Sequence, residues 1–359
     1  MRLLFVSPVA ADAPPGGRAL LANLHRTALR EILAANFAEH LIDLSQRASP
    51  AQALAGHIDG VTAASIAAVV ARIGAEQIDA VWLDGSNLGR LVQGIARTAP
   101  HVRTIVFCHN VEARFFAGAL RAAPGLHALG VLAANILAER AALRAASTVV
   151  TLSPRDSDVL TRLYGRGADA ILPMAMADQI AGAAGDDTLL PPDAPLLFAG
   201  GGFYANRAGI AWFARKVAPR IALRTQIVGR GLEPLAPLLA KVPNVELVGE
   251  VGDLAPFYRA ARAVIAPIFD GSGMKTKVAE ALMHGKPVIG TPEAFSGYAA
   301  DVRAAGRVCT DAAGFVAAIA GIAAAPVKTL DPALRDLYQR DHSAAAVRAR
   351  LDDILRKPS

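Results

Sequence analysis

A short stretch, residues 270–291, combines glycines and lysines at a spacing that suits the binding of a phosphate. Gly271 and Gly273 allow the backbone to pass close to a ligand, because glycine has no Cβ. Lys275 and Lys277 follow directly and supply two positive charges. Backbone N–H groups at a helix start bind anions, so a glycine turn that leads into a lysine-bearing helix predicts an anion cradle.

The elements that position this cradle follow from the residues around it. The apolar run Ala263 to Ile268 predicts a buried strand, and a helix is expected from about Met274 to His284. Gly285 fits the position after a helix end, and a further strand begins at Pro287. Basic residues in a first turn oppose the helix dipole, and a bound anion would remove this conflict.

A second group of polar residues follows another expected strand, Thr104–Cys108. His109 and Asn110 come directly after it, at the edge of a parallel sheet where ligands bind. A histidine there can donate a hydrogen bond to a sugar hydroxyl or a phosphate, or take part in proton transfer. The alternative is a histidine that is satisfied by the backbone of its own loop.

A long loop, from Val9 to Gly17, follows the first expected strand and contains the sequence PPGG. Loops of this length in compact domains are often functional. Gly16 and Gly17 stand directly before a predicted helix. The alternative is an ordinary surface turn.

Length and composition restrict the class of protein. The chain has 359 residues, of which 53% are hydrophobic and 19% are charged, so we expect two folded domains rather than a disordered chain. The net charge of +6 suggests an anionic partner. The basic residues are dispersed and lack the aromatic pattern of RNA-binding modules, so we expect no nucleic acid partner.

The sequence predicts neither a membrane span nor a signal peptide. The most apolar long segment, Ala128 to Val150, is interrupted by charged residues from Glu139 onward. The apolar start of the chain is short and fits a strand better. Cys108 and Cys309 are far apart in the sequence and show no metal spacing, which favours a reducing cytoplasm over a disulfide framework.

Short apolar runs alternate with helical patterns through most of the chain, which predicts an α/β protein with parallel sheets. Two Rossmann-like, doubly wound domains that face each other across a cleft fit this pattern best. The first series of expected strands is Leu3–Ser7, Leu41–Leu44, Ala80–Asp84, Thr104–Cys108, Thr148–Leu152 and Ala170–Leu172. The second series is Leu196–Ala199, Thr225–Val228, Val245–Val248, Ala263–Pro267, Pro287–Gly290 and Arg307–Cys309.

The two series are separated by a proline-rich stretch from Gly182 to Pro195. We therefore expect an N-terminal domain over residues 1–185, a linker over 186–195 and a C-terminal domain over 196–330. A helical segment over 331–359 follows and can pack back across either domain. Parallel sheets bind ligands at the carboxyl ends of their strands, so the cleft is the expected site.

Several segments resemble the GT-B glycosyltransferases that use nucleotide sugars, in particular the retaining family 4. The donor-site signature of that family is similar to Gly271-Ser272-Gly273, Lys277, Glu280-Ala281 and Gly285-Lys286-Pro287-Val288. Further similar segments, in the family's order, are Gly16-Gly17, His109-Asn110-Val111-Glu112, and Gly200 to Asn206 with Trp212-Phe213. The resemblance covers most of the chain and is more specific in its second half.

The resemblance implies roles for the matching residues. Glu280 would bind the ribose hydroxyls of the nucleotide, since a carboxylate accepts two hydrogen bonds. Lys275 and Lys277 would neutralise the diphosphate and stabilise the departing nucleotide, and His109 would complete the catalytic set from the first domain. The alternatives are a local helix pair between Lys277 and Glu280, and two solvated surface lysines.

The chain departs from the family pattern at two points. The arginine and lysine that the family usually has early in the second domain are not both present, because Asn206 and Arg207 occupy that turn. The family carries a further glutamate eight positions before the one that matches Glu280, and Ser272 stands there in this chain. The resemblance therefore leaves the donor sugar and the detailed catalytic arrangement open. The full set of expected donor-site residues is Gly16, Gly17, Asn206, Arg207, Arg230, Val251, Gly271, Ser272, Gly273, Met274, Lys275, Lys277 and Glu280.

The implied activity is the transfer of a sugar from a nucleotide diphosphate to a glycan or glycolipid hydroxyl, with retention of configuration and with neither a cofactor nor a metal. The nucleotide sugar would be a co-substrate, and the acceptor a glycan or a lipid-linked saccharide. A nucleotide-sugar epimerase and a non-catalytic sensor or scaffold are the alternatives. The expected location is the cytoplasm, with peripheral contact at the inner face of the membrane.

Two helices mix cations with apolar groups, as a surface for an anionic, lipid-linked acceptor would. An amphipathic helix that buries its apolar side chains and solvates its arginines would show the same pattern. The residues concerned are Arg114-Phe115-Phe116 with Leu120-Arg121, and Arg18, His25, Arg26 and Arg30.

Overall fold

The chain forms two compact units, each built on one parallel sheet. The computed structural model describes residues 1–13, 16–180 and 188–357. Part of the expected linker (186–187) and the prolines of the first loop (14–15) therefore lie outside the described residues. Unit 1 comprises Met1–Pro173 and Ala344–Ser359, and unit 2 comprises Met174–Ser343.

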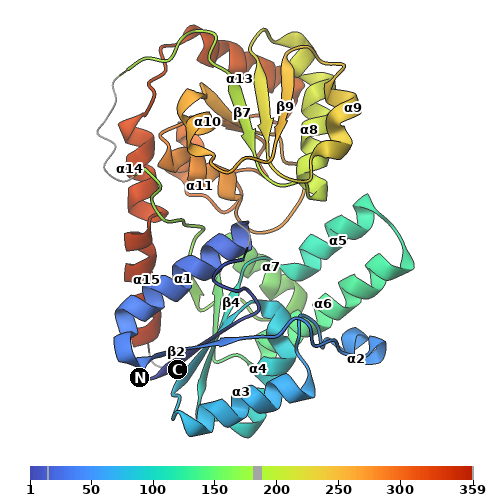
Figure 1. Ribbon diagram of the computed structural model, residues 1–359, viewed down its shortest axis with the longest axis vertical. Helices are drawn as coiled ribbons and strands as arrows, with labels where there is room; N and C mark the ends of the chain where they lie inside the picture. Colours follow the sequence, from blue (N-terminus) through green and yellow to red (C-terminus); the bar gives the residue numbers. More distant parts are fainter. Residues whose placement is uncertain (14–15, 181–187, 358–359) are drawn as a thin grey trace. The chain divides into compact units, whose positions relative to one another are not determined.

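Unit 1 is a six-stranded parallel sheet with crossover helices (Figure 1). The strand order is β2-β1-β3-β4-β5-β6. Its strands are β1 (Leu3–Ser7), β2 (Phe37–Leu41), β3 (Ala80–Asp84), β4 (Arg103–Cys108), β5 (Thr148–Thr151) and β6 (Ala170–Ile171). Its helices are α1 (Gly17–Leu33), α2 (Pro50–Leu54), α3 (Ala63–Ala75), α4 (Gly89–Thr98), α5 (Glu112–Ala122), α6 (Leu126–Ala145), α7 (Pro154–Tyr164) and α15 (Ala344–Arg356).

Unit 2 repeats this architecture with the strand order β12-β11-β10-β7-β8-β9. Its strands are β7 (Leu196–Ala199), β8 (Thr225–Val228), β9 (Val245–Gly249), β10 (Ala263–Ala266), β11 (Val288–Gly290) and β12 (Arg307–Val308). Its helices are α8 (Tyr204–Lys216), α9 (Ala236–Leu239), α10 (Ala255–Ala260), α11 (Thr276–Met283), α12 (Ala300–Ala305), α13 (Ala312–Ala324) and α14 (Pro332–Asp341). The expected α/β fold with two doubly wound sheets is confirmed.

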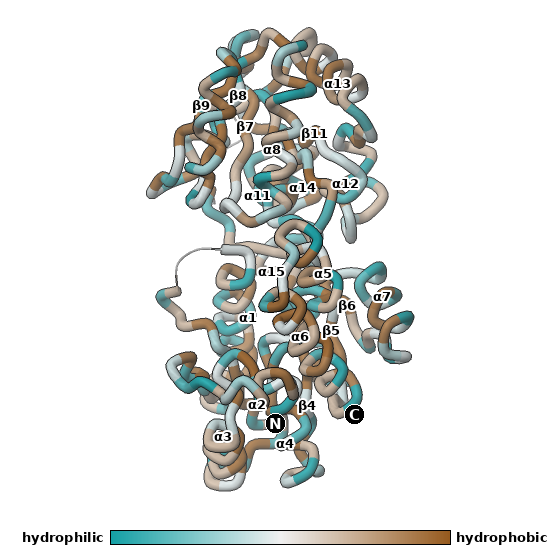
Figure 2. The backbone as a smooth tube through the Cα atoms, turned by 90° about the vertical axis from the view of Figure 1, so that its right-hand side faces the viewer, coloured by the Kyte–Doolittle hydropathy of each residue, from teal (hydrophilic) through white to brown (hydrophobic). Residues whose placement is uncertain are grey.

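The central strands are buried on both faces, which explains their continuous apolar sequences. In β1, Leu3 to Val6 are fully buried, and in β10 the same holds for Ala263 to Ala266. The helices instead alternate between hydrophobic and hydrophilic stretches along the tube in Figure 2, as amphipathic crossovers should.

The expected strand at Leu41–Leu44 is wrong. β2 spans Phe37–Leu41 and pairs with β1 in a register that sets Leu3 beside Phe37. After it, Asp43 accepts a hydrogen bond from the backbone N–H of Ser45 at 2.9 Å, so this segment turns. β2 is an edge strand of half-buried, mixed residues, and such a strand gives a weaker apolar signal than its neighbours.

Helix α6 is the one described helix that is long and apolar enough to cross a membrane by length and composition alone. It contacts α4 and α5 within unit 1 and buries part of its second half, whereas Leu126, Leu129 and Leu137 are exposed. At Gly89 a Cβ would lie 1.8 Å from the carbonyl oxygen of Ala138, so α4 starts directly against α6.

The C-terminal helix α15 packs back on unit 1, beside α1 (Figure 1). Arg103, at the start of β4, donates hydrogen bonds to the carbonyl oxygens of Ile354 (3.0 Å), Leu355 (3.2 Å) and Lys357 (2.8 Å). These carbonyls end a helix and would otherwise lack partners, so the guanidinium caps α15.

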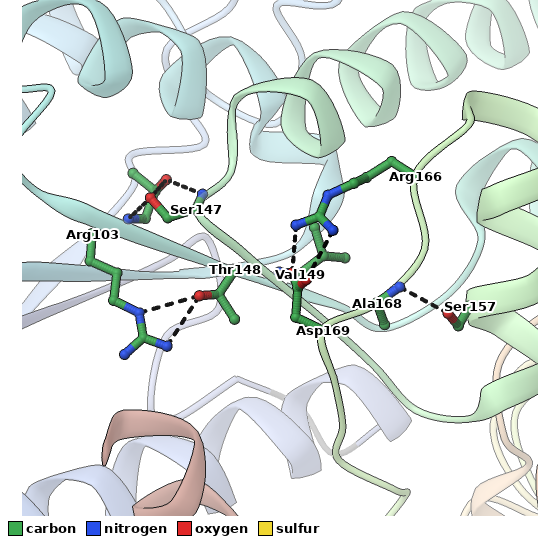
Figure 3. A network of polar contacts seen from close by, with 9 residues as sticks. Arg103, Ser147, Thr148, Val149, Ser157, Arg166, Ala168 and Asp169 are labelled. Carbon is green, nitrogen blue, oxygen red and sulfur yellow. Dashed lines mark hydrogen bonds and ion pairs between the residues drawn. The ribbon is translucent and has the colours of Figure 1, made fainter. Parts of the chain in front are cut away.

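The same guanidinium also anchors the neighbouring strand, as Figure 3 shows. It donates to Thr148 Oγ1 on β5 at 3.1 and 3.2 Å. Further along this edge, Arg166 forms an ion pair with Asp169 at 2.6 Å, and Asp169 accepts from the backbone N–H of Val149 at 2.8 Å. One arginine thus joins the last helix of the chain to the sheet of unit 1.

We expect Arg103→Ala to lower the stability of unit 1 by about 1–3 kcal/mol, because several charge-assisted hydrogen bonds are lost together. Urea denaturation would measure the change, and limited proteolysis should release the last helix earlier than in the wild type. Arg97→Ala, an exposed arginine of α4, is the matched control. Equal stability of the two variants would contradict the capping role.

Candidate functional site

Three loops meet at the carboxyl edge of the unit 2 sheet. They comprise residues 200–202 after β7, 229–231 after β8 and 269–275 after β10. β7 and β10 are neighbours in the sheet, and the strand order reverses between them, which is where doubly wound sheets bind ligands. The first two loops lie in contact, because a Cβ at Gly202 would stand 1.7 Å from the carbonyl oxygen of Gly231.

The glycine turn before α11 has the geometry that the sequence predicts. Gly271 (φ +126°) and Gly273 (φ +65°) both have positive φ, which favours glycine. Helix α11 is shorter than expected and begins at Thr276, because Lys275 is still extended at its N-cap. The Gly285 cap is confirmed: its φ is +59°, and Lys286 N–H donates to the carbonyl oxygen of Ala281 at 2.8 Å in a Schellman arrangement.

Lys277 is buried and connects two of these loops. Its Nζ donates to Asn206 Oδ1 at 2.9 Å, and Asn206 Nδ2 donates to the carbonyl oxygen of Gly201 at 2.7 Å. The ammonium also lies 4.5 Å from the ring centroid of Phe198 on β7. The lysine and asparagine that the sequence assigns to one donor site are therefore in direct contact.

The environment of Lys277 disfavours its charge. Burial, and to a smaller extent the nearby Lys275, lower the pKa of Lys277 to about 7, although Glu280 acts in the opposite direction. Its hydrogen-bond partner is a neutral amide. An anionic ligand bound beside Lys277 would therefore raise the pKa of this lysine and favour its charged form.

Lys275 has a different environment. Its Nζ forms an ion pair with Glu293 at 3.1 Å and donates to the carbonyl oxygen of Gly273 at 2.9 Å. Both side chains are largely buried. Glu293 was not predicted from the sequence. Lys275 therefore has a role beyond the predicted one, because it holds the glycine turn in place as well as carrying charge.

Glu280 lies on α11, one turn after Lys277. The Tyr258 hydroxyl donates to Glu280 Oε2 at 2.8 Å, and Tyr258 stacks on His284 with ring centroids 4.5 Å apart. Burial raises the pKa of Glu280, whereas the Tyr258 hydrogen bond and Lys277 lower it. Among the described residues no ion pair joins Lys277 to Glu280, but each charge shifts the pKa of the other.

The remaining predicted residues of unit 2 vary in exposure. Ser272 and Met274 are buried in the turn, and the sulfur of Met274 accepts from the Met174 N–H at 3.4 Å. Val251 is half-buried beyond β9. Arg207, in the first turn of α8, and Arg230, on the loop after β8, have exposed side chains.

In unit 1, His109 is buried at the carboxyl edge of the sheet, as its position predicts. Its Nε2 lies 2.8 Å from Asp84 Oδ1, and Asp84 Oδ2 accepts from Ser7 Oγ at 2.7 Å. Burial alone would raise the pKa of Asp84, but His109, Arg18 and the Ser7 hydroxyl lower it to about 2. This carboxylate fixes the orientation of the imidazole.

Gly16 and Gly17 begin α1. Gly16 is the N-cap and has extended backbone, and a Cβ added there would meet no atom within 4 Å. Because Pro14 and Pro15 are not described, the predicted loop is seen only in part.

The basic surface expected on α1 is wrong in two of its four residues. His25 is fully buried between Trp82 and Phe107, and burial lowers its pKa to about 3. Arg26 is 3% exposed and forms an ion pair with Glu39 at 2.6 Å. Both contribute to the core of unit 1, because helix α1 presents this face to the sheet.

The residues of the unit 2 site lie within a segment that matches a known protein family. Residues 194–324 match the family model for Glycosyl transferases group 1. The matched range contains the glycine turn, both lysines and the carboxylate of Glu280. No curated protein matches the chain significantly by sequence.

Solved structures match the whole chain and show its fold to be GT-B. HepE from Anabaena, in complex with UDP and glucose, has 14% identity and a TM-score of 0.66 over 99% of each chain. The α,α-trehalose 6-phosphate synthase from Burkholderia multivorans has 14% identity and a TM-score of 0.66 over 99% of this chain and 96% of its own. WaaB, a lipopolysaccharide outer core galactosyltransferase, has 12% identity and a TM-score of 0.61 over 99% of each chain.

Sequence reasoning missed several partners of the predicted residues. Asp84 had a readable signal, since it is a charged residue at the carboxyl end of an apolar strand. Glu293 and Tyr258 had none, because they are brought to α11 by packing over long stretches of chain. Among the residues that the structure describes, no group of three or more His, Cys, Asp or Glu side chains is placed to hold a metal ion.

Proposed function

We propose that the protein is a retaining, metal-independent glycosyltransferase that takes a sugar from a nucleoside diphosphate. The observation that carries this proposal is the buried Lys277 ammonium, which lies at the strand reversal of unit 2 beside a neutral amide. A diphosphate at the glycine turn would supply the missing negative charge, and the helix N-terminus of α11 would donate backbone N–H groups to it. The family match over the same residues supports this assignment.

The carboxylate of Glu280 fits the ribose of such a donor. Tyr258 occupies one of its oxygens, and among the described residues Oε1 has no hydrogen-bond partner, so it can accept from a ribose hydroxyl. HepE was solved with UDP and with UDP-glucose, which makes a uridine nucleotide the first donor to test. We propose a glycan or lipid-linked saccharide as acceptor, and action in the cytoplasm at the inner membrane face.

Thermal shift with UDP-, GDP- and ADP-sugars tests the donor directly. A ligand that binds the folded state at 100 times its Kd adds about 2.7 kcal/mol of stability. Slow release of nucleoside diphosphate without acceptor would support the transferase. Recovery of a donor of unchanged mass and altered sugar would indicate an epimerase, and tight binding without any conversion would indicate a sensor. No stabilisation by any nucleotide sugar would overturn the proposal.

The pKa of Lys277 predicts how nucleotide binding depends on pH. In the free protein this lysine loses its proton near pH 7, whereas a bound diphosphate favours the charged form. Above pH 7, binding therefore takes up a proton, and the affinity for UDP should fall by up to about tenfold per pH unit until the pKa of the complex is reached. Isothermal titration calorimetry from pH 6 to 9 would measure this, and the dependence should weaken in Lys277→Met.

A further inference from the structure

Unit 1 contains a cavity of about 670 Å³ that none of the roles above uses. It lies between α2, α6 and the segment from Leu44 to Gly60, and Phe116 of α5 closes part of it. A volume of this size is typical of sites for small organic ligands. All of its lining residues belong to unit 1, so the cavity is a property of this unit alone.

One end of the cavity is polar and adjoins the carboxyl edge of the sheet. Arg18 follows β1, Asn87 follows β3 and Glu112 follows β4, and the strand order reverses between β1 and β3. Arg18 donates to Asn87 Oδ1 at 3.2 Å and lies 3.9 Å from Asp59 Oδ2. Charged groups of both signs and an amide therefore converge on one end.

Two of the lining residues have buried polar atoms that the protein does not satisfy. Within the described part of the chain, neither Arg18 Nε nor His57 Nδ1 has a hydrogen-bond partner. Leaving such groups unpaired costs free energy, and a hydroxylated ligand would remove that cost. Glu112 adds a buried carboxyl group, whose pKa is raised to about 7 by burial and by Glu139, so it can donate as well as accept.

The remaining walls of the cavity are mostly apolar, with Gln46, Arg47, His127 and Asn135 among the apolar side chains. They include Ala53, Leu54, Val131 and Ala134. At the rim, the exposed fractions are 55% for Leu44 and 52% for Leu54, which is high for leucine side chains. The cavity is therefore amphipathic, with hydrogen-bonding groups at the sheet edge and hydrocarbon towards α2 and α6.

We propose that this cavity binds an acceptor that joins a sugar to an alkyl chain, with the sugar at Arg18 and Glu112 and the chain between α2 and α6. This inference rests on the proposed transferase function and names its acceptor class. The hydroxyls of the sugar satisfy the polar end. The alkyl chain covers the exposed leucines, which a free glycan would leave in water.

Gly130 offers a way to block the apolar half without disturbing the fold. It lines the cavity from α6, and a Cβ added there would meet only Leu54 Cδ2, at 3.7 Å. Any residue other than glycine or proline is also more favourable within a helix. Gly130→Phe should therefore fill the space between α2 and α6, and Gly130→Ala is the matched control.

Calorimetry with octyl β-D-glucoside, below its micellar concentration, tests the proposal without any donor. We expect it to bind at least about tenfold more tightly than methyl β-D-glucoside and than 1-octanol. Gly130→Phe should remove this preference, while Gly130→Ala should retain it and Arg18→Gln should weaken the binding of the glucoside but not of octanol.

Equal affinity for the two glucosides, or an octyl preference that survives in Gly130→Phe, would overturn the proposal. Stabilisation of the same protein by nucleotide sugars is the separate readout of the transferase function. If nucleotides bind and octyl glucoside does not, the acceptor class is wrong and the function stands. If octyl glucoside binds and no nucleotide does, the cavity is a binding site in a protein of another function.

Discussion

Lys277→Met is expected to lower kcat/KM for sugar transfer by at least about 100-fold while unit 2 stays folded. The variant removes a preorganised cation from the place where charge develops on the departing diphosphate, and losses of this size follow the removal of such groups. Methionine fills nearly the same volume against Phe198. The variant removes the desolvation cost of a buried ammonium but leaves Asn206 Oδ1 without its donor, so these effects oppose each other and the melting temperature should change little.

Donor turnover and thermal unfolding, measured on the same preparation, separate the two effects. Lys241→Met, an exposed lysine of unit 2, is the control for the loss of one positive charge. Lys275→Met should instead lower both activity and stability, because it breaks the ion pair with Glu293 at 3.1 Å. Full activity in Lys277→Met would remove this residue from the site.

Glu139→Ala is expected to destabilise unit 1 by about 3 kcal/mol or more. This buried carboxylate of α6 accepts four hydrogen bonds. Oε1 accepts from the backbone N–H of Glu112 (2.8 Å) and from Ser86 Oγ (3.2 Å). Oε2 accepts from the Tyr164 hydroxyl (2.8 Å) and from the Ala113 N–H (3.2 Å). Truncation leaves these donors buried without a partner and removes the cap of α5.

Urea denaturation measures this effect. Glu139→Gln should lie between the wild type and Glu139→Ala, because its amide keeps one acceptor oxygen and places an N–H₂ group among donors. Glu31→Ala, which removes an exposed carboxylate of α1 that is 3.4 Å from Arg348, should change the free energy of unfolding by less than about 1 kcal/mol. A loss of the same small size in Glu139→Ala would show that the four hydrogen bonds contribute little.

The strands of both sheets could be predicted from the sequence, because buried parallel strands are continuous apolar runs. Strands such as Leu3–Ser7 and Ala80–Asp84 match their predicted bounds. The prediction for β2 was wrong because an edge strand lacks a continuous apolar run. The glycine turn was readable for a similar reason, since Gly271 and Gly273 are required by their positive φ.

The candidate site was predicted less completely than the fold. The sequence placed Lys277 at the turn but could not show that its partner is Asn206, 71 positions earlier. It also treated His25 and Arg26 as surface cations, because the pattern of a helix does not reveal which polar residues a neighbouring sheet will cover. Long-range hydrogen bonds and ion pairs depend on tertiary packing, which cannot be predicted from the spacing of residues along the sequence.

The assignment of α15 to unit 1 has a consequence for how the protein is made. Unit 2 is one continuous insertion, Met174–Ser343, within unit 1. During synthesis unit 2 can fold as soon as its last helix emerges, whereas Arg103 waits for Ile354 to Lys357, which follow unit 2 in the sequence. Unit 1 is therefore completed only after unit 2 has emerged, in contrast to the usual N-to-C order of domain folding.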